Sequence, residues 1–316
     1  MTSVFKEPYL QDEAAAFVAL EAIVWPQGPV CPHCGCMGRI AALKGVKDKK
    51  GRERLGLKKC YHCRKQFTVR VGTIFERSHV PLHVWFQAAF LMCSSKKGVS
   101  SNQLHRTLGV SLQTAWFMSH RLREAMRTGS LAPMGGAGRT VEADETFIGR
   151  KDGSVKRRGH GHKNAVLSLV DRESKQVRSF HVDGTSAADI VPIIKANVAK
   201  ETAIMTDEGG HYFTLGDHFA SHESVSHKAD EYVRGDVHTN TVEGYYSIFK
   251  RGMKGVYQHC SERHLHRYLA EFDFRYSNRV KLGIDDLARM GKAMEGIIGK
   301  RLTYREPSAE WRASAP

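Results

Sequence analysis

Residues 141–146, VEADET, carry the acidic side chain on which the fold prediction depends. They belong to a strand-like run, residues 139–148, whose side chains alternate between two faces of a sheet. Asp144 therefore shares one face with Glu142 and Thr146. The chain has 316 residues, of which 41% are hydrophobic, so it can bury at least two cores. We expect an α/β domain built around this strand.

Two further acidic residues stand on separate expected elements. Asp207 directly follows the apolar run 203–206, at the carboxyl end of a second strand, where open α/β sheets place their chemistry. Glu243 lies 36 positions later on an amphipathic helix, and Lys250 follows it by seven. At about 100° per residue, Glu243 and Lys250 lie within roughly 20° of one another on that helix. Three carboxylates from separate elements fit a pair of divalent cations, which catalyse in-line attack on phosphodiesters.

The identity of the third ligand has an alternative. Asn240 precedes Glu243 by three residues and faces roughly the same side of the helix. Its amide oxygen can coordinate a hard cation such as Mg²⁺, and it can also act as the helix N-cap. Neighbouring acids are further alternatives to the three chosen carboxylates: Glu142, Glu145 and Glu208.

Seven cysteines include two Cys-x-x-Cys pairs, Cys31 with Cys34 and Cys60 with Cys63, separated by 25 residues. Four thiolates at this spacing predict a closed tetrahedral Zn²⁺ site in a ribbon-like module. Other nearby residues offer substitute ligands: Cys36, His33 and His62. The N-terminal residues lack the basic-then-apolar pattern of a signal peptide, so we expect a reducing, cytoplasmic compartment.

The net charge of +15 and the sequence pI near 9.6 favour a polyanionic partner. Basic side chains crowd the loop between the two cysteine pairs: Lys44, Lys47, Lys49, Lys50, Arg52, Arg54, Lys58 and Lys59. A second basic loop spans residues 150–163. Each loop either contacts nucleic-acid phosphates, which give affinity without sequence readout, or forms a solvated basic face. No apolar run is long enough to predict a membrane helix.

Residues 101–108 and 112–126 predict two helices joined by a Gly109-Val110 turn, in a helix-turn-helix pattern. Ser111 is placed to cap the second helix. The expected DNA-facing residues of that helix are Gln113, Thr114, Phe117 and His120, with Arg121 and Arg123 near phosphates. The pattern predicts a nucleic-acid-binding module between the cysteine module and the acidic domain.

The remaining elements follow from periodicity and turn residues. Helices are expected at 12–24, 81–127, 188–198, 241–253, 262–276 and 284–301, a hairpin at 165–170 and 176–182, and a short strand at 202–206. A Gly- and Pro-containing linker is expected at 128–139. These segments predict four regions: 1–78, 79–130, 139–280 and 281–316.

Taken together, these motifs resemble bacterial insertion-sequence transposases with an N-terminal zinc ribbon. The resemblance covers about residues 10–280. It rests on several motifs: Trp25-Pro26-x-Gly28, Cys31-Pro32-x-Cys34-Gly35, Phe67-x-x-Arg70-x-Gly72-Thr73-x-Phe75, Asp144-Glu145-Thr146, Thr206-Asp207, His238-Thr239-Asn240-Thr241-Val242-Glu243, Phe249-Lys250-Arg251 and the run from His264 to Tyr276.

The resemblance implies an RNase H-like mixed-sheet catalytic domain, preceded by a zinc ribbon and a helix-turn-helix-like module, and DNA transposition of the DDE type. It places the catalytic acids at Asp144 and Asp207, and a third ligand at Asn240 or Glu243; the spacing to Asp207 and to Lys250 favours Glu243. It implies Mg²⁺ or Mn²⁺ at this site, structural Zn²⁺, double-stranded DNA as partner, and a homodimer or larger assembly on DNA of the bacterial nucleoid. A nuclease of the same fold and a DNA-binding regulator with an inactive second domain are the alternatives.

Overall fold

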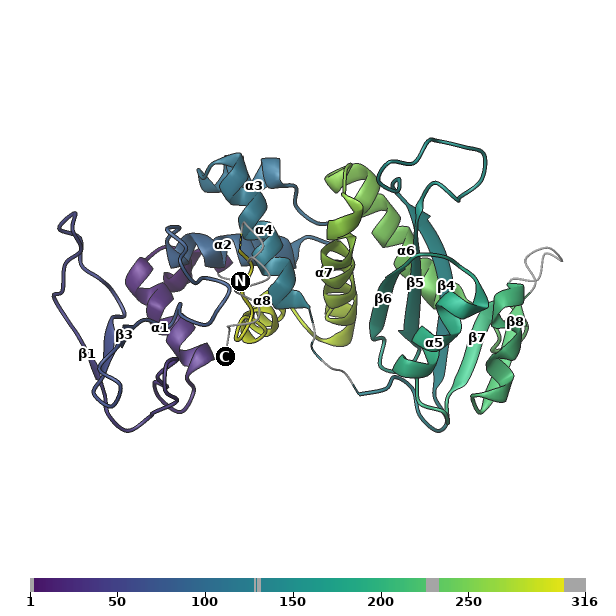
Figure 1. Ribbon diagram of the computed structural model, residues 1–316, viewed down its shortest axis with the longest axis horizontal. Coiled ribbons are helices and arrows are strands. Elements are labelled where there is room, and N and C mark those ends of the chain that lie inside the picture. The colour runs from purple at the N-terminus through teal and green to yellow at the C-terminus, as the bar shows by residue number, and fades with distance from the viewer. Residues whose placement is uncertain (1–2, 128, 130–131, 226–232, 304–316) are drawn as a thin grey trace. The chain divides into compact units, whose positions relative to one another are not determined.

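The computed structural model describes residues 3–127, 129, 132–225 and 233–303 (Figure 1). The chain forms two compact units. The first comprises Met1–Ser94, Ser100–Met126 and Asp285–Pro316, and the second comprises Ser95–Val99 and Arg127–Ile284. Part of the expected linker at 128–139 lies outside the described residues, as does the tail beyond residue 303. The finer division into four regions stays a prediction. In the described part, no helix has both the length and the apolar character needed to cross a membrane.

The first unit combines a small sheet with helices. Its three strands pair antiparallel in the order β1-β2-β3, and the second strand ends at a cysteine of the second pair. The elements are α1 (Glu13–Val24), β1 (Ile40–Ala42), β2 (Lys58–Cys60), β3 (Gln66–Phe67), α2 (Leu82–Ser94), α3 (Ser101–Leu108), α4 (Leu112–Met126) and α8 (Asp286–Glu295). The expected helix at 12–24 is confirmed, and the expected tract at 81–127 divides into three helices.

The two expected helices at 101–108 and 112–126 are confirmed as α3 and α4. Gly109 ends α3 in the left-handed conformation, with φ of 66°, which glycine adopts without steric cost. Ser111 caps α4 as expected, because its Oγ accepts the backbone N–H of Thr114 at 3.1 Å. Gly109 and Ser111 therefore define the turn between the two helices, as the sequence predicted.

The last helix is shorter than expected. It was predicted to run from 284 to 301, but α8 ends at Glu295. At Gly296 the backbone passes so close to the Ala125 carbonyl that an added Cβ would lie 2.1 Å from its oxygen. Ile298 then forms an isolated β-bridge with Thr73, and the Gly299 N–H donates to the Gly72 carbonyl at 2.8 Å. Tertiary contact with the preceding helices overrides the helical periodicity here.

The second unit is built on a five-stranded mixed sheet in the order β6-β5-β4-β7-β8. Its strands are β4 (Thr140–Ile148), β5 (Asn164–Asp171), β6 (Val177–Val182), β7 (Ala203–Asp207) and β8 (Ser221–Val225). The first three strands are antiparallel, whereas β7 pairs parallel with β4, and β8 pairs parallel with β7. This 3-2-1-4-5 arrangement is the RNase H-like topology, so the expected fold class is confirmed. The strand β8 was not expected from the sequence, because its five residues, Ser-His-Glu-Ser-Val, include only one apolar side chain.

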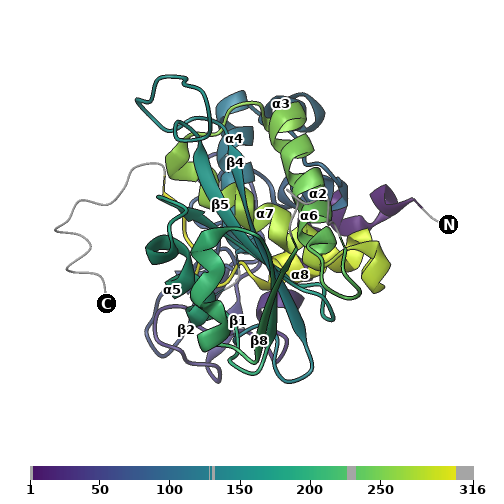
Figure 2. The same ribbon diagram turned by 90° about the vertical axis from the view of Figure 1, so that its right-hand side faces the viewer.

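Helices cover both faces of this sheet (Figure 2). On one face, α5 (Ala187–Asn197) and the 3₁₀ segment η3 (Gly210–Asp217) pack over Val141, Ala143 and Leu167. On the other face, α6 (Asn240–Gly252) and α7 (Leu265–Ser277) pack over Val166 and Val170. The strand alternation separates the two cores, because neighbouring residues point to opposite faces. Asp144 is on the face covered by α6.

A buried carboxylate joins α7 to the sheet and to α6. Asp273 accepts the hydroxyl of Tyr245 at 2.6 Å, and it accepts the hydroxyl and the backbone N–H of Ser179 at 2.7 and 2.8 Å. Burial raises the pKa of Asp273 to about 6, while these three donors oppose the shift. Three hydrogen bonds satisfy a group that would otherwise be costly to bury, and they hold α6 against the sheet.

Candidate active site and cysteine cluster

Asp144 and Asp207 lie on neighbouring strands at matching heights. The parallel register of β4 and β7 pairs Thr140 with Ala203 and Glu142 with Met205. The same offset, carried two residues further, brings Asp144 beside Asp207. Adjacent strands are about 4.8 Å apart, and residues two apart share a face, so both side chains project toward α6. The sheet thus brings together the two acids that are 63 positions apart in the chain.

Glu243 comes to these acids from the first turn of α6. Its side chain is exposed, and its Oε1 accepts the Thr239 hydroxyl at 3.2 Å. The expected N-cap role of Asn240 is wrong: the N-cap is Thr239, and Asn240 is the first helical residue and exposed. The free backbone N–H groups at this helix end are satisfied by another residue.

That residue is Glu142, whose side chain is completely buried. Its Oε2 accepts the backbone N–H groups of Thr241 and Val242 at 2.8 and 2.9 Å. Its Oε1 accepts Nε of Arg172 at 2.6 Å. A carboxylate at a helix N-terminus satisfies orphan donors and the helix dipole together. Glu142 therefore fastens the start of α6, and with it Glu243, to the strand that carries Asp144.

Tyr246 and Lys250 continue this contact along α6. The Tyr246 hydroxyl donates to the backbone carbonyls of Asp144 and, at 3.2 Å, of Val166. Lys250 Nζ lies 5.7 Å from the centre of the Tyr246 ring, so the ammonium is on the same side of the helix as the strand contact. As expected from the helical repeat, a half-buried cation stands two turns after Glu243.

The acids interact electrostatically. Burial, and after it the charges of Glu145, Asp207 and Glu243, raise the pKa of Asp144 to about 7, while the Glu145 backbone N–H opposes the shift. The three chosen carboxylates are less tightly gathered than the cysteines: among the residues that the structure describes, only the four cysteines form a group of three or more metal-type ligands within 4.8 Å of one another. Carboxylates that are less tightly gathered than this could still hold a pair of divalent cations.

This raised pKa predicts a pH dependence of stability without added divalent cation. The folded state binds a proton at Asp144 more tightly than the unfolded state does, so its contribution to stability is present below pH 3.8 and is lost as the pH rises through about 7. Asp144→Asn removes the charge and is expected to stabilise the protein at pH 7.5 by about 1–3 kcal/mol, and by much less at pH 4. Urea unfolding of both proteins at both pH values measures this. An equal difference at the two pH values would contradict the prediction.

A second cluster of polar residues adjoins the site and was not assigned a role from the sequence. The nearly buried Glu145 carboxylate accepts the Tyr212 hydroxyl at 2.5 Å and contacts Nε2 of His211 at 2.7 Å. Burial raises the pKa of Glu145, although the Tyr212 and His211 contacts oppose the shift. Glu145 alternates to the opposite face from Asp144, and its Oε1 has these partners, which supports a structural role.

The four cysteines of the two pairs converge. Sγ of Cys31 is 3.6 Å from Sγ of Cys63, and Sγ of Cys34 is 3.7 Å from Sγ of Cys60. These distances exclude disulfides, whose sulfurs are about 2 Å apart. Around one ion with Zn–S of about 2.3 Å, tetrahedral thiolates are about 3.8 Å apart, so the cluster fits zinc. The backbone N–H groups of Cys63 and His62 lower the pKa of Cys60 to about 6, although burial opposes this shift. The lowered pKa favours the thiolate form of Cys60.

The substitute ligands considered from the sequence are not in this cluster. The group of converging ligands contains none of Cys36, His33 and His62. Of the basic residues in the loop between the pairs, Lys58 forms an ion pair with Glu21 at 2.9 Å, and Arg52 pairs with Asp48 at 2.8 Å. Several others are exposed: Lys44, Lys47, Lys49, Lys50 and Arg54.

Three expected DNA contacts of α4 are wrong. His120 and Arg123 are buried, and Arg121 is only 6% exposed. Arg121 donates to the carbonyls of Ile74, Glu76 and Leu302, so it closes the core of the first unit and cannot reach phosphates. These positions were expected to be exposed because they carry basic side chains. Helical periodicity alone does not show that the apolar stem of an arginine can extend into a core.

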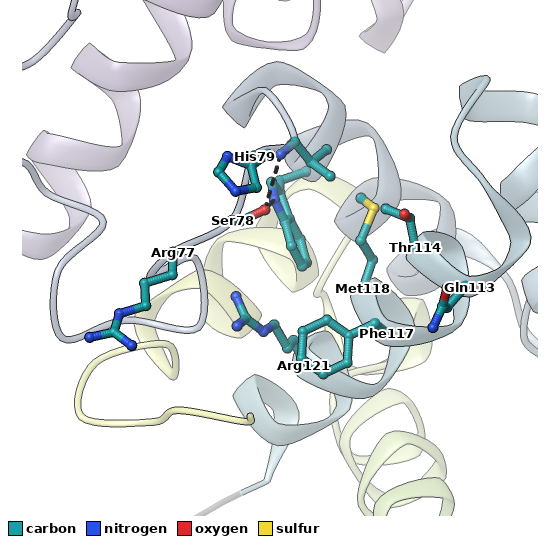
Figure 3. A pocket seen from close by; sticks show the side chains of 10 residues that line it. Arg77, Ser78, His79, Gln113, Thr114, Phe117, Met118 and Arg121 are labelled. Carbon is teal, nitrogen blue, oxygen red and sulfur yellow. Dashed lines mark hydrogen bonds between the residues drawn. The ribbon is translucent and has the colours of Figure 1, made fainter. Parts of the chain in front are cut away.

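The other expected residues of α4 remain accessible. Gln113 is exposed, and Thr114 and Phe117 are half-buried. They line a cavity of about 270 Å³ together with Arg77 and His79 from the loop before α2 (Figure 3). The Arg121 guanidinium lies 4.6 Å from the centre of the Phe117 ring at the base of this cavity. The amino-terminal half of α4 is therefore the accessible part of the helix.

Comparison with known proteins agrees with this architecture. Residues 11–66 match the transposase zinc-ribbon domain, and residues 135–277 match the ISXO2-like transposase domain. An uncharacterized protein in the transposable element ISH50 of Halobacterium salinarum is 28% identical over 280 residues, covering 83% of this chain and 90% of that protein.

Two solved structures are also similar in part. The magnesium complex of the HTLV-2 integrase catalytic core is 13% identical, covers 45% of this chain and 86% of its own, and gives a TM-score of 0.26. The Mos1 strand transfer complex is 16% identical, covers 59% of this chain and 74% of its own, and gives a TM-score of 0.20.

The RNase H-like sheet, the ribbon and the two matched domains define a DNA transposase of the DDE class. Together the matched segments span more than half of the chain. The chain belongs to the insertion-sequence transposases that carry a zinc ribbon before an ISXO2-like transposase domain.

Proposed function

We propose that this transposase cleaves the ends of an insertion sequence and joins the freed 3′-OH to target DNA at a site formed by Asp144, Asp207 and Glu243. The observation that carries the proposal is the β4–β7 register, which brings two acids side by side beneath the helix that bears the third. The pKa of Asp144, raised in part by the other two charges, supports their proximity.

The residues present fit a pair of hard cations. Carboxylate oxygens are the ligands that Mg²⁺ prefers, and it needs few of them because it keeps water and substrate oxygens in its shell. Bound Mg²⁺, or Mn²⁺ in its place, would supply Lewis acidity to the scissile phosphate and lower the pKa of the attacking water. Asp144, Asp207 and Glu243 would hold these cations.

The chain's own residues orient the reaction. Water attacks the phosphorus at the transposon end and the P–O3′ bond breaks, which leaves a 3′-OH. That hydroxyl then attacks a target phosphodiester and displaces its 3′ oxygen. Lys250, beside the Tyr246 ring, contacts a backbone phosphate, and Glu142 keeps α6 at the correct height over the sheet. Structural Zn²⁺ on Cys31, Cys34, Cys60 and Cys63 takes no part in this chemistry.

DNA contacts are assigned to accessible basic and polar residues in both units. In the first unit these are the exposed lysines of the ribbon loop and the amino-terminal half of α4. In the second they are Lys250 and the exposed loop residues Lys156, Arg157 and Arg158. We further propose that the protein acts on bacterial nucleoid DNA in the cytoplasm, as a dimer or larger assembly that pairs two ends.

A joining assay tests the proposal. The purified chain is incubated with Mg²⁺, a duplex made from the DNA that flanks the gene, and a supercoiled plasmid. We expect cleavage at the end of the insertion sequence, followed by covalent transfer of that end into the plasmid. Cleavage without any joined product would contradict transposition and favour a nuclease.

The third ligand is tested by paired variants. Glu243→Gln is expected to reduce joining by about a hundredfold or more, because it removes a charge that holds the cation. Asn240→Ala is expected to retain most activity, because Asn240 is exposed and Thr239 is the N-cap. Initial rates of joining at saturating Mg²⁺ measure both. A larger loss in the Asn240 variant would reverse the assignment.

A further inference from the structure

The segment Ser95–Val99, which joins α2 to α3, belongs to the second unit, although both of these helices belong to the first. Arg275 of α7 donates from Nη1 to the Ser95 carbonyl at 2.8 Å. Gly98 has a φ of 99°, and a Cβ added there would lie 2.0 Å from the Tyr257 hydroxyl oxygen. The segment is therefore held at both ends, against α7 and against the turn that follows α6.

The middle of the segment lies against the carboxyl end of α6. A Cβ added at Gly252, the last residue of α6, would lie 2.6 Å from the Lys97 carbonyl oxygen. Only a residue without a side chain lets two backbones approach this closely. Lys97 therefore lies beside the last turn of α6 and the π-helical turn η5 (Met253–Tyr257) that continues it, although Lys97 and Gly252 are 155 positions apart in the chain.

This contact gathers basic side chains from two distant segments on one surface. The segments 95–99 and 250–258 contain no acidic residue. Their exposed cations, which we call the basic patch, are Lys96, Lys97, Arg251 and Lys254. Lys250, already assigned to a phosphate, is half-buried one residue before Arg251. The patch therefore extends the positive surface of α6 beyond Lys250.

The composition of this surface favours DNA over a protein partner. A cation in the last turn of a helix, such as Arg251, also interacts favourably with the helix dipole. Lys96 and Lys97 belong to another element, so helix stability does not require them. Among the described residues, the large apolar side chains that are exposed all lie outside the two segments. Protein interfaces have apolar, aromatic centres, whereas DNA interfaces are polar and strongly positive.

The basic patch and the proposed metal site share one helix. Arg251 is eight residues beyond Glu243, which is about 12 Å along the axis at 1.5 Å per residue. Along duplex DNA, about 12 Å corresponds to three or four base pairs at about 3.4 Å each. A duplex with one phosphate at the metal site therefore has further phosphates within reach of the patch.

We propose that the basic patch binds the backbone phosphates of the DNA that is cut, about three to five base pairs from the scissile bond. The proposal rests on the proposed function, because the active site defines where the DNA crosses α6. Phosphate contacts give affinity and fix the position of the duplex without reading its sequence. The segment between α2 and α3 thus becomes part of the substrate-binding surface of the catalytic unit.

The salt dependence of binding tests the proposal. The full chain is titrated against a fluorescently labelled duplex of about 30 base pairs from the DNA that flanks the gene, without divalent cation, at several salt concentrations. Lys96→Ala with Lys97→Ala is expected to lower the affinity about tenfold. It should also reduce the slope of log affinity against log salt by about two, because two phosphate contacts are lost.

The matched control is Lys195→Ala with Lys200→Ala, which removes the same charge from two exposed lysines of the second unit. Both precede β7 and so lie away from the end that carries Asp207. The control should bind with nearly the wild-type slope. An unchanged slope in the Lys96 and Lys97 variant would overturn the proposal. An equal loss in the control would also overturn it, because net charge alone would then explain the effect.

Uncharged methylphosphonate linkages locate the contact along the DNA. Placed about three to five base pairs from the cut, on both sides, they should weaken wild type about tenfold and the Lys96 and Lys97 variant much less. Equal weakening of both proteins would contradict the assigned position. Normal joining with an unchanged salt slope would remove the patch and leave the transposase mechanism, whereas an altered slope without any joining would do the reverse.

Discussion

Asp144→Asn and Asp207→Asn are each expected to reduce end cleavage and strand joining by about a thousandfold or more, with DNA affinity essentially unchanged. Asparagine keeps the size of the side chain but removes the negative charge that holds a divalent cation. Losing that cation removes several kcal/mol of transition-state stabilisation. Both acids are at the α6 face of neighbouring strands, so both reaction steps should fail together.

Rates of cleavage and joining, with anisotropy for DNA affinity, measure this. Glu201→Gln is the matched control, because Glu201 is an exposed acid before the opposite end of β7 and should behave as wild type. Normal joining by both the Asp144 and Asp207 variants would show that the catalytic site lies elsewhere. Loss of DNA binding together with activity would instead indicate a folding defect and leave the chemical role unsupported.

Cys60→Ser is expected to abolish zinc binding and to unfold the ribbon. Cys60 is completely buried, and its Sγ is 3.7 Å from that of Cys34 in the four-thiolate cluster. The three-stranded sheet of this module is short, and a structural zinc contributes about 10 kcal/mol or more to such small folds. DNA affinity should fall sharply, since the exposed lysines of the loop lose their support. The second unit has its own two cores and should stay folded.

Metal content by mass spectrometry, DNA affinity and limited proteolysis together measure this result. Cys36→Ser is the sharpest control, because Cys36 is only two positions from Cys34 and outside the converging cluster. It should keep about one zinc per chain. A normal zinc content in the Cys60 variant, or a lost zinc in the Cys36 variant, would show that the ligand set is wrong.

Several features of the site could be predicted because they are local in the sequence. Strand alternation fixed the face of Asp144, and the apolar run before Asp207 placed that residue at a strand end. The cysteine spacing predicted the cluster that the structure shows, because each Cys-x-x-Cys turn directs two sulfurs to one point. Ser111 was recognised as a cap because capping depends on residues three apart.

Other features could not be predicted because they depend on partners distant in the chain. From the sequence, Glu142 was an alternative catalytic acid, yet in the structure it caps a helix that begins about 100 residues later. Asn240 is a residue type that is common at helix N-caps, but Glu142 already accepts the free backbone N–H groups at that helix end. Arg121 and Arg123 were expected near DNA phosphates, but in the structure both are buried in the core of the first unit.

The amino-acid sequence by itself determined which elements form, which cysteines can share a metal, and which acids belong to the transposase pattern, since periodicity and short spacings are local properties. Only the tertiary structure decided which of several acids adjoin the active site and which are structural. Carboxylates are chemically alike, so their roles depend on the strands and helix ends beside them.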